Sequence, residues 1–370
     1  MSDSMDRKVL TGVMILVGGA IGAGFLAIPY GIAKCGLLLG LIQLLLVGLV
    51  SGFMSLYVAE LVSRVKGRHQ VVGLVGKFLG KKGKIFITLA MFIGIYGALT
   101  AYGIGISTML SELLGIDYTL VTIALFSVAG FIIHKGIRAV DKSEVISMFF
   151  LIPTLIFLSI VALSEFKLPN IMTINIKNFF YPFGIILFAC LAYQSVPEIS
   201  KVVEKKKLRK VILLGTFLFV ALYSLFAFSF VGAYGQGVEE LAVESLSGIW
   251  RIVGILVGTL AMATTFLILG LVIRDTYIED YNLKPTYSFL LTILPPFFIT
   301  LLRLNFATVV GLTGAITGGL VGIILGYTVY VARKKQKTKP EFMVPGGTAT
   351  IIITTIVFLL GMTFEVMKYI

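Results

Sequence analysis

The sequence predicts an all-α membrane protein that forms a single transmembrane domain over residues 1–370. Its composition is 58% hydrophobic and 13% charged with a mean hydropathy of +1.02, values that a soluble domain with a polar surface does not reach. Apolar stretches of about 20 residues recur along the chain, and two of them are interrupted by glycine or proline. These observations predict eleven spanning helices, at about 9–34, 37–62, 85–114, 118–134, 143–163, 179–200, 210–234, 246–273, 286–302, 306–332 and 348–367.

The distribution of charge predicts the topology. The net charge of +13 would suit a nucleic-acid partner, but the basic residues lie in loops between the apolar stretches. A cytoplasmic N-terminus assigns about 25 of the 31 Lys and Arg residues to cytoplasmic loops. The acidic residues Glu239, Glu240 and Glu244 then lie outside. We therefore expect a multi-pass protein of the cell membrane with its N-terminus inside and its C-terminus outside, whose basic loops contact lipid head groups and not nucleic acid.

The first apolar stretch is interrupted by the sequence VGGAIGAGFLAIPY at residues 17–30. Glycine lowers helix stability and Pro29 lacks an N–H group, so the helix should unwind near Gly22 to Phe25. Non-helical backbone at membrane depth occurs only where it is buried in protein or lines a cavity. The half-helix after the break would point its free N–H groups and partial positive charge at the membrane centre, an arrangement that suits a carboxylate.

The sixth stretch, FFYPFGIILFACLAYQSVPEISKVVE, is bracketed by Pro182 and Pro197. A break near Phe188 to Ala192 would direct helix C-terminal carbonyl groups into the same region, where they suit an ammonium group. A ligand with both groups on one carbon, an α-amino acid, fits this pair of helix ends. The alternative is that the two prolines only kink a packing helix.

The two interrupted helices are five helices apart. Discontinuous helices at matching positions of two halves are typical of an inverted-repeat transporter. We therefore expect repeat one at about 9–163, repeat two at about 179–332, and an additional eleventh helix at about 348–367.

Three segments resemble a known family. GAGFLAIPYGIAKCG resembles the first-helix signature of the amino acid/auxin permeases, FACLAYQSVPEI resembles their sixth-helix segment, and TTFLILGLVIRDTYIED resembles their eighth helix. The hydroxy and aromatic amino acid permeases are similar, and both groups belong to the amino acid–polyamine–organocation superfamily. The resemblance implies the leucine-transporter fold, alternating access, and a substrate held between helices one, three, six and eight.

The resemblance also implies the substrate contacts. The backbone of the first break would bind the carboxylate, and carbonyl groups of the sixth break would bind the amine. Many superfamily members have a glycine in the sixth break, where this chain has alanine and tyrosine, so the register of this break and the width of the site depart from the family pattern. The implied residues are Gly22, Ala23, Gly24 and Phe25 in the first helix, and Phe188, Ala189, Cys190, Ala192 and Tyr193 in the sixth.

The third helix offers Tyr96 and Tyr102 as hydroxyl donors to a substrate carboxylate. They are separated by about 600° of helical rotation, so at most one of them faces the site. We expect Tyr102 to be that residue, and the alternative for each tyrosine is ordinary packing.

The eighth helix contains a carbonyl at Ala261 followed by hydroxyls at Thr264 and Thr265, a pattern that resembles the one used by sodium-coupled members of this fold. With carbonyl groups of Gly18 and Ile21 these would form a site of five oxygens without a carboxylate, suited to a weakly held hard cation. The alternative is that both threonine hydroxyls bond back to carbonyls one turn earlier and only pack.

Proton coupling is the second possibility for the coupling ion. Some superfamily members place a lysine on helix five, and this chain has none between residues 143 and 163. Ionisable residues within membrane helices are functional by default, but here they are expected near the cytoplasmic ends, or in one case toward the outer end of helix eleven. These residues are Glu60, His134, Glu144, Glu198 and Arg274, with Glu365 in helix eleven.

The resulting prediction is a symport permease that moves neutral L-amino acids, coupled to Na⁺, with no cofactor other than the coupling cation. A proton-coupled permease, an exchanger and a non-transporting amino acid sensor are the alternatives. An enzyme is not expected, since the two histidines, His69 and His134, do not lie in the middle of a predicted helix. Cys35 and Cys190 lie on different helices and predict neither a disulfide nor a metal site.

Overall fold

The computed structural model describes residues 2–67, 69–136, 143–279, 281–335 and 340–368, and all regular structure in these ranges is helical. Within these ranges eight helical segments are long and apolar enough to cross a membrane, and a pair of helices bent by 58° at residues 21–23 adds a ninth span. Two shorter apolar helices, Leu151–Leu163 and Pro285–Leu301, complete the set. The all-α prediction is confirmed in these ranges, whereas eleven crossings and an inverted repeat stay predictions.

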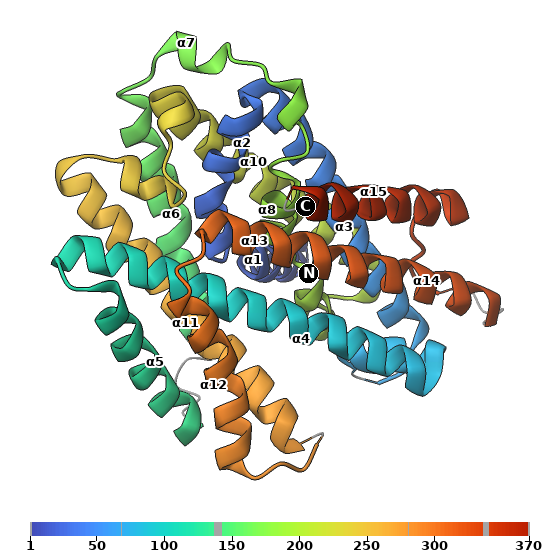
Figure 1. The fold of residues 1–370 in the computed structure, drawn as a ribbon. Coiled ribbons are helices and arrows are strands. Elements are labelled where there is room, and N and C mark those ends of the chain that lie inside the picture. The colour runs from blue at the N-terminus through green and yellow to red at the C-terminus, as the bar shows by residue number, and fades with distance from the viewer. Residues whose placement is uncertain (1, 68, 137–142, 280, 336–339, 369–370) are drawn as a thin grey trace.

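The elements follow one another as a series of long helices linked by short helical turns (Figure 1). The α-helices are α1 (Ser2–Ala20), α2 (Ile28–Cys35), α3 (Leu37–Arg64), α4 (Val71–Leu114), α5 (Tyr118–Lys135), α6 (Ser143–Leu163), α7 (Leu168–Ile171), α8 (Phe183–Ala189), α9 (Val196–Val202), α10 (Leu208–Tyr234), α11 (Gly248–Glu279), α12 (Pro285–Leu301), α13 (Phe306–Thr313), α14 (Gly319–Lys335) and α15 (Gly347–Met367). The 3-10 turns are η1 (Ala23–Ala27), η3 (Ile176–Asn178), η4 (Tyr193–Ser195), η5 (Lys205–Lys207), η6 (Gly235–Gly237) and η7 (Ala242–Ser245), and η8 (Gly314–Gly318) is π-helical.

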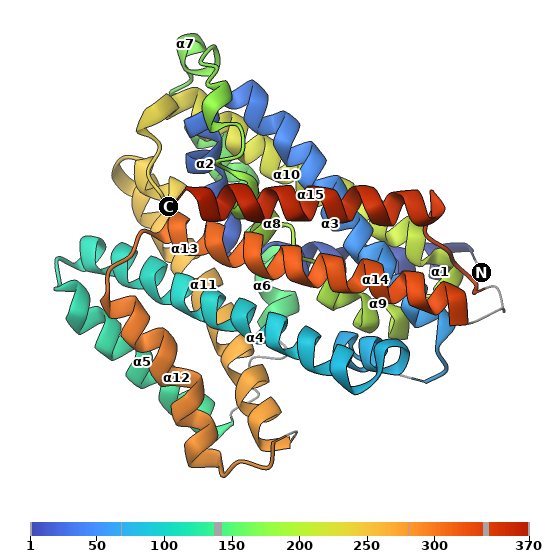
Figure 2. The same ribbon diagram turned by 45° about the vertical axis from the view of Figure 1, so that its right-hand side comes forward.

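The long helices are arranged on two sides of α4. Figures 1 and 2 both show α5, α12 and the end of α11 gathered on one side of it, with α3, α14 and α15 on the other. In Figure 2 the marks for the N- and C-termini lie at opposite ends of the long helices. We call these the N-terminal end and the C-terminal end of the bundle.

The first span is broken where the glycine cluster predicted it. Helix α1 ends at Ala20, Gly22 adopts an extended backbone with φ −95° and ψ −162°, and a 3-10 turn leads into α2. Pro29 lies in the first turn of α2, where its missing N–H group costs no hydrogen bond. The predicted interruption of this helix is confirmed.

The sixth span is also broken. Helix α8 ends at Ala189, the chain forms the irregular turn 190–195, and α9 begins at Val196. Pro182 precedes α8, and Pro197 lies in the first turn of α9. The prolines therefore mark the starts of two half-helices and do not kink one continuous helix.

A third interruption, which the sequence analysis missed, lies in the tenth span. Helices α13 and α14 are joined by the π-helical turn η8, and the sequence GLTGAITGG runs through the junction. The turn lies against α8, because a Cβ atom built on Gly314 would be 2.1 Å from the carbonyl oxygen of Gly184. Small residues allow this close approach of two helix backbones. A glycine cluster like that of the first span was the signal available in the sequence.

The third span is longer than predicted. The sequence predicted a helix from about residue 85, but α4 begins at Val71. Gly80 bends it with φ +71° and ψ −161°, a conformation that glycine adopts without steric cost. The lysine-rich segment before residue 85 is thus helical and not a loop.

Candidate functional site

The three broken spans meet at a central cavity of about 260 Å³, which also borders α4, α6 and α11. Its lining combines backbone of the first break with hydroxyl, amide and apolar side chains, and includes no charged side chain among the described residues. The lining residues are Gly18, Gly19, Ala20, Ile21, Gly22, Gly24, Met91, Gly94, Ile95, Ala98, Tyr102, Leu151, Phe188, Ala189, Leu191, Gln194, Ser195, Ala261, Thr264, Thr265, Ile268, Leu269, Val272, Thr313 and Thr317.

Most of the residues predicted for the site come together in this cavity. They arrive from four separate stretches of the chain, and their binding roles stay predictions. Those that line it are Gly22, Gly24, Tyr102, Phe188 and Ala189 of the predicted substrate site, and Gly18, Ile21, Ala261, Thr264 and Thr265 of the predicted ion site. The side chain of Ala23 lies outside the described residues.

Four predicted substrate residues lie outside the cavity lining. Phe25 is 4% exposed and packs on aromatic rings of α10, while Cys190, Ala192 and Tyr193 are fully or almost fully buried in the turn 190–195. The hydroxyl of Tyr193 accepts a hydrogen bond from Gln194 Nε2 at 3.1 Å. Neighbouring residues of an irregular turn point in different directions, so spacing along the sequence did not select those that face the cavity.

Tyr102 faces the first break across the cavity. Its hydroxyl oxygen would lie 3.2 Å from a Cβ atom built on Gly22. Tyr96 points elsewhere, because its hydroxyl lies 2.8 Å from both the Tyr277 hydroxyl and the Leu291 carbonyl oxygen. The preference for Tyr102 over Tyr96 as the cavity-lining tyrosine therefore agrees with the structure.

The backbone at the first break offers N–H groups. The N–H group of Gly22 donates to the Ala20 carbonyl oxygen at 2.8 Å, and η1 begins at the next residue. No side chain among the described residues caps η1, and the first N–H groups of a helix have no partner within it. Such N–H groups have the geometry that suits an anionic group, and the binding of a carboxylate here stays a prediction.

The carbonyl groups at the sixth break are already engaged by hydroxyls that the sequence analysis missed. The Tyr223 hydroxyl of α10 lies 2.9 Å from the Ala20 carbonyl oxygen and 3.0 Å from that of Ala189. Ser51 Oγ of α3 donates to the Cys190 carbonyl oxygen. Tyr223 thus links the ends of α1 and α8, and nothing in its local sequence indicates this role.

The predicted ion-site residues are adjacent but bonded within their own helix. Thr264 Oγ1 lies 3.0 Å from the carbonyl oxygens of Leu260 and Ala261, and Thr265 Oγ1 lies 2.9 Å from the Ala261 carbonyl oxygen. The structure therefore shows the alternative arrangement given in the sequence analysis, in which both threonine hydroxyls bond to carbonyl groups one turn earlier. In this arrangement Thr265 donates to the Ala261 carbonyl oxygen, and Thr264 donates its single proton to the carbonyl oxygen of either Leu260 or Ala261.

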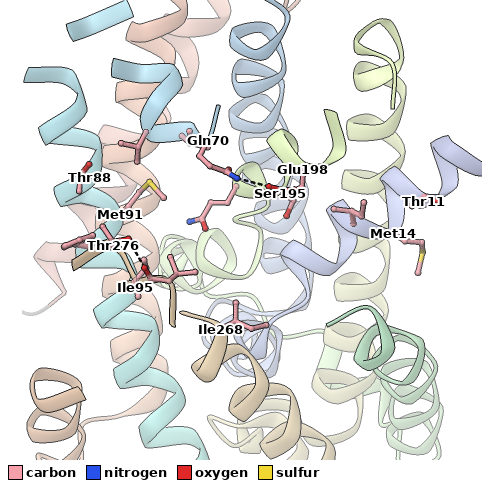
Figure 3. Close-up of a pocket in the computed structure, with 16 residues that line it drawn as sticks. Thr11, Met14, Gln70, Thr88, Met91, Ile95, Ser195, Glu198, Ile268 and Thr276 are labelled. Carbon is pink, nitrogen blue, oxygen red and sulfur yellow. Dashed lines mark hydrogen bonds between the residues drawn. The ribbon is translucent and has the colours of Figure 1, made fainter. Parts of the chain in front are cut away.

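The central cavity continues into a larger vestibule of about 770 Å³ (Figure 3). Met91, Ile95, Gln194, Ser195, Ile268 and Val272 line both spaces. Gln70 Nε2 and Glu198 Oε1 form a 2.7 Å hydrogen bond beside it. Its other walls include Thr11 of α1 and Thr276 near the end of α11, so the vestibule leads to the N-terminal end of the bundle.

Aromatic packing follows the first break in the direction of the C-terminal end. The ring of Phe25 lies 6.4 Å from that of Tyr223 and 5.2 Å from that of Phe226, measured between centroids. Phe226 in turn lies 4.4 Å from Phe230. These four rings are 0–4% exposed and form a continuous plug beside the cavity.

Several ionisable residues considered from the sequence form ion pairs near helix ends. Glu60, which is fully buried, is bound by Arg333 and Arg64 at 2.7 Å and by the N–H group of Val344 at 2.8 Å. Arg274 pairs with Asp275 at 2.7 Å. The side chain of Glu144 lies outside the described residues.

Glu365 is less peripheral than expected. It is 1% exposed, its carboxylate lies 2.6 Å from Lys368 Nζ, and Oε1 is 2.6 Å from the position of a Cβ atom on Gly311. Helix α15 therefore presents a paired carboxylate to α13. The position of Glu365 near the end of its helix does not predict this burial, because burial of a side chain depends on the neighbouring helices.

Comparison with known proteins agrees with this architecture. The chain is 28% identical over 322 residues to tyrosine-specific transport system 1 of Haemophilus influenzae, a match that covers 78% of this chain and 79% of that protein. It is 26% identical over 243 residues to glutamine transporter 2 of Aliivibrio fischeri, and the match spans 62% of each. A shorter match of 114 residues at 32% identity links it to tyrosine-specific transport system 2 of Haemophilus influenzae.

The sequence profile that describes the tryptophan/tyrosine permease family matches residues 5–368, a range that contains every broken span and every residue of the central cavity. This result supports a permease of amino acids, as the resemblance implied, and leaves the wider superfamily as a prediction. The chain is a multi-pass membrane protein, and it belongs to the tryptophan/tyrosine permease family.

Proposed function

We propose that the protein is a secondary active transporter that moves neutral L-amino acids across the cell membrane by alternating access. The observation that carries the proposal is the uncharged cavity of about 260 Å³ at the junction of three broken helices. A charged substrate side chain would be desolvated there without a counter-charge, which is costly in a membrane. The names of the relatives, two tyrosine transport systems and a glutamine transporter, support a neutral amino acid as cargo.

The helix ends account for both charged groups of such a substrate. Its carboxylate would accept hydrogen bonds from N–H groups at the start of η1 and from the Tyr102 hydroxyl. Its ammonium group would donate to the carbonyl oxygens of Phe188 and Ala189 at the end of α8. The Tyr223 hydroxyl can direct its single proton to Ala20 while the Ala189 carbonyl accepts from the substrate.

The vestibule defines the state of the transport cycle that we propose. The positive-inside rule assigns the N-terminal end to the cytoplasm, because Arg64, Lys201, Lys205 and Lys335 lie at that end. The vestibule then opens to the cytoplasm, whereas the aromatic plug beside Phe25 closes the cavity on the outer side. This is an inward-open conformation.

Sodium is the coupling cation that we propose. In the inward-open state Thr264 and Thr265 bond to the Ala261 carbonyl, which is the arrangement expected of an ion site that has released its cation. Rotation of the two hydroxyl groups would free three oxygens of α11 to join the carbonyls of Gly18 and Ile21. Among the described residues the two fully or almost fully buried carboxylates, Glu60 and Glu365, both have cationic partners, so neither is a ready proton carrier.

The decisive experiment measures uptake of labelled tyrosine, tryptophan and glutamine by liposomes that contain the purified protein. An inward sodium gradient and an inward proton gradient are applied separately. Accumulation driven by sodium supports both the substrate and the ion assignments. Accumulation driven only by protons retains the permease and rejects the ion site, while binding without uptake or exchange identifies a sensor.

The Gly22→Ala variant tests the substrate site. The new methyl group would lie 3.2 Å from the Tyr102 hydroxyl, in the space where we place the substrate carboxylate. Gly22 has a backbone conformation that alanine adopts, so the fold should persist. We expect a rise of roughly tenfold or more in the half-saturating substrate concentration, since one charge-assisted hydrogen bond is worth about 1.5–3 kcal/mol.

Gly237→Ala is the matched control for this variant, because a Cβ atom at Gly237 meets nothing within 4 Å. It should transport as the wild type does. Unchanged transport by both variants would reject the assignment of the carboxylate to the first break.

The double variant Thr264→Val with Thr265→Ala tests the ion site. It removes two of the five proposed oxygen ligands, so the dependence of uptake on sodium should disappear or shift to much higher concentrations. Thr276→Val serves as the control, because this threonine lies on the same helix and also bonds back, to Val272 at 2.8 Å. An unchanged sodium response in the double variant would assign both hydroxyls to packing.

A further inference from the structure

Another cavity is separate from the central cavity and the vestibule. It lies on the side of the bundle where α3 and α15 run next to α8. It is an apolar groove of about 410 Å³, which we call the α3–α15 groove. Its rim side chains are largely exposed, at 51% for Leu46, 55% for Leu49 and 61% for Ile353. In a membrane these exposed apolar side chains face lipid, so the groove is open to molecules dissolved in the bilayer.

Gln43 is the exceptional residue of this groove. Its side chain is 2% exposed, and neither Nε2 nor Oε1 has a hydrogen-bond partner among the described residues. The other deeply buried polar residue of the lining, Thr354, is satisfied by the Tyr57 hydroxyl at 2.8 Å. A buried polar group without a partner costs about 1–3 kcal/mol, so an unpaired amide at this depth indicates a missing partner.

The shape of the groove describes that partner. Along α3 its lining runs from Gln43 to Phe53, ten residues or about 15 Å of helix. Along α15 it runs from Thr350 to Leu360, which is about the same length. Gln43 lies near the start of α3, at the end of the groove closer to the C-terminal face. The occupant is therefore elongated and apolar, with one polar group at the end nearer the membrane surface.

We propose that the α3–α15 groove binds a membrane lipid alcohol, whose hydroxyl group pairs with the Gln43 amide and whose chain lies along the groove. A hydroxyl can satisfy both orphaned atoms, because it accepts from Nε2 and donates to Oε1 once the amide, which is covered in the empty groove, turns toward it. An ester or ether oxygen would accept from Nε2 and leave Oε1 unpaired. The chemistry of the amide thus selects an alcohol over a simple acyl ester.

The groove is connected to the transport site through α8. Phe180 and Phe183 line it, and Phe183 is the first residue of α8, whose opposite end contributes Phe188 and Ala189 to the central cavity. A bound lipid would therefore contact the half-helix that we expect to move during transport. This consequence rests on the proposed function, whereas lipid binding itself does not.

The test uses two photoreactive probes in liposomes that contain the full protein. One is a long-chain alcohol with a diazirine in its chain, and the other is its methyl ether, which can accept but cannot donate a hydrogen bond. Labelled peptides are mapped by mass spectrometry. We expect the alcohol to label residues 43–53 and 350–360 roughly two- to tenfold more than the ether, the range that one net hydrogen bond provides.

Two variants and a control complete the test. Gln43→Leu should abolish the preference for the alcohol while chain labelling persists, and Val47→Phe should fill the groove and reduce labelling by both probes. Leu213→Phe, a lipid-exposed position on α10 outside the groove, should change neither. Equal labelling of the wild type by both probes would overturn the proposal, whether or not the variants fold and whether or not the protein transports amino acids.

Discussion

At the scale of single residues, Tyr223 shows how one hydroxyl group organises the site. It carries one proton but lies within 3.0 Å of two carbonyl oxygens, at Ala20 and Ala189. It therefore donates to one of them at a time, and the other needs a donor from elsewhere. In the function that we propose, a substrate ammonium group would be such a donor, and Tyr223 would then act as a positioning residue between the two broken helices.

Glu244, in the loop between α10 and α11, provides a prediction about pH. Burial, and then the nearby charge of Glu112, raise the pKa of this carboxyl from 4.5 to about 8. Its Oε1 atom has no hydrogen-bond partner in the described part of the chain, and Arg251 is paired with Glu112 at 2.5 Å. The folded protein therefore binds a proton here that the unfolded chain releases at neutral pH.

The sign of the effect follows from this pKa difference. The stabilising contribution of Glu244 is complete below pH 4.5 and is lost as the pH rises through about 8. We expect the melting temperature in detergent to fall between about pH 5 and about pH 8 in the wild type, and to fall less in Glu244→Gln. Glu279→Gln, at the exposed last residue of α11 and away from this loop, is the control and should retain the wild-type slope. Parallel slopes in all three proteins would show that Glu244 is already ionised when folded.

At the scale of elements, three interrupted helices converge on one cavity through small residues. Gly24 lies against Phe188, since a Cβ atom there would be 2.6 Å from the Phe188 ring. Gly19 approaches Ser195 in the same way, and Gly184 approaches η8. The glycines thus serve two purposes, because they break the helices and allow the broken ends to touch.

The contact between α8 and the tenth span can be tested with Gly184→Ala. Its Cβ atom would lie 2.1 Å from the Gly311 carbonyl oxygen, which is backbone and cannot move aside as a flexible side chain would. We expect a loss of at least about 2 kcal/mol in stability or a failure to fold, as overpacking of a tight core produces. The measurement is unfolding in detergent, monitored by the loss of a monodisperse gel-filtration peak.

Gly76→Ala is the matched control for this prediction. It is also a helical glycine, but a Cβ atom there makes only an ordinary contact of 3.4 Å with Lys84. Replacing it should leave the protein as stable or slightly more stable, because alanine favours a helix by up to about 1 kcal/mol over glycine. Equal behaviour of the two variants would mean that α8 and α13 are packed less closely than the structure shows.

The elements also show what sequence patterns can and cannot predict. The breaks at residues 17–30 and 190–195 follow from glycine and proline, whose effects on a helix are local. The tenth span also contains a glycine cluster, but its apolar composition predicted one continuous helix. The cavity-facing residues of the turn 190–195 could not be identified, because an irregular turn has no fixed period that links spacing to direction.

At the scale of the whole molecule, charge and access to the cavity are both asymmetric. The vestibule opens at the N-terminal end, where basic side chains are abundant, and the aromatic plug lies toward the end that carries the acidic loop with Glu239, Glu240 and Glu244. If the N-terminal end is cytoplasmic, the central cavity is reached from the cell interior in this conformation.

Cysteine labelling tests this orientation directly. The native Cys35 and Cys190 are fully buried, so their background reaction with a membrane-impermeant thiol reagent should be low. We expect Thr11→Cys, in the vestibule, to react only in inside-out vesicles. Glu239→Cys, in the acidic loop, should react only in right-side-out vesicles. The reverse pattern would invert the topology, and reaction of both variants from one side would refute an odd number of crossings between residues 11 and 239.

The sequence alone determined the class of the protein, the approximate positions of its long apolar helices, two of the three helix breaks and ten of the residues that line the central cavity. These features depend on hydropathy and on the conformational properties of glycine and proline, which act within a few residues. The tertiary structure decided which hydroxyls engage the broken ends, where the plug and the vestibule lie, and that Gln43 is buried without a hydrogen-bond partner in the described part of the chain. Those features depend on contacts between helices distant in sequence, and hydrogen-bond satisfaction and burial are properties of the packed bundle, not of any one segment.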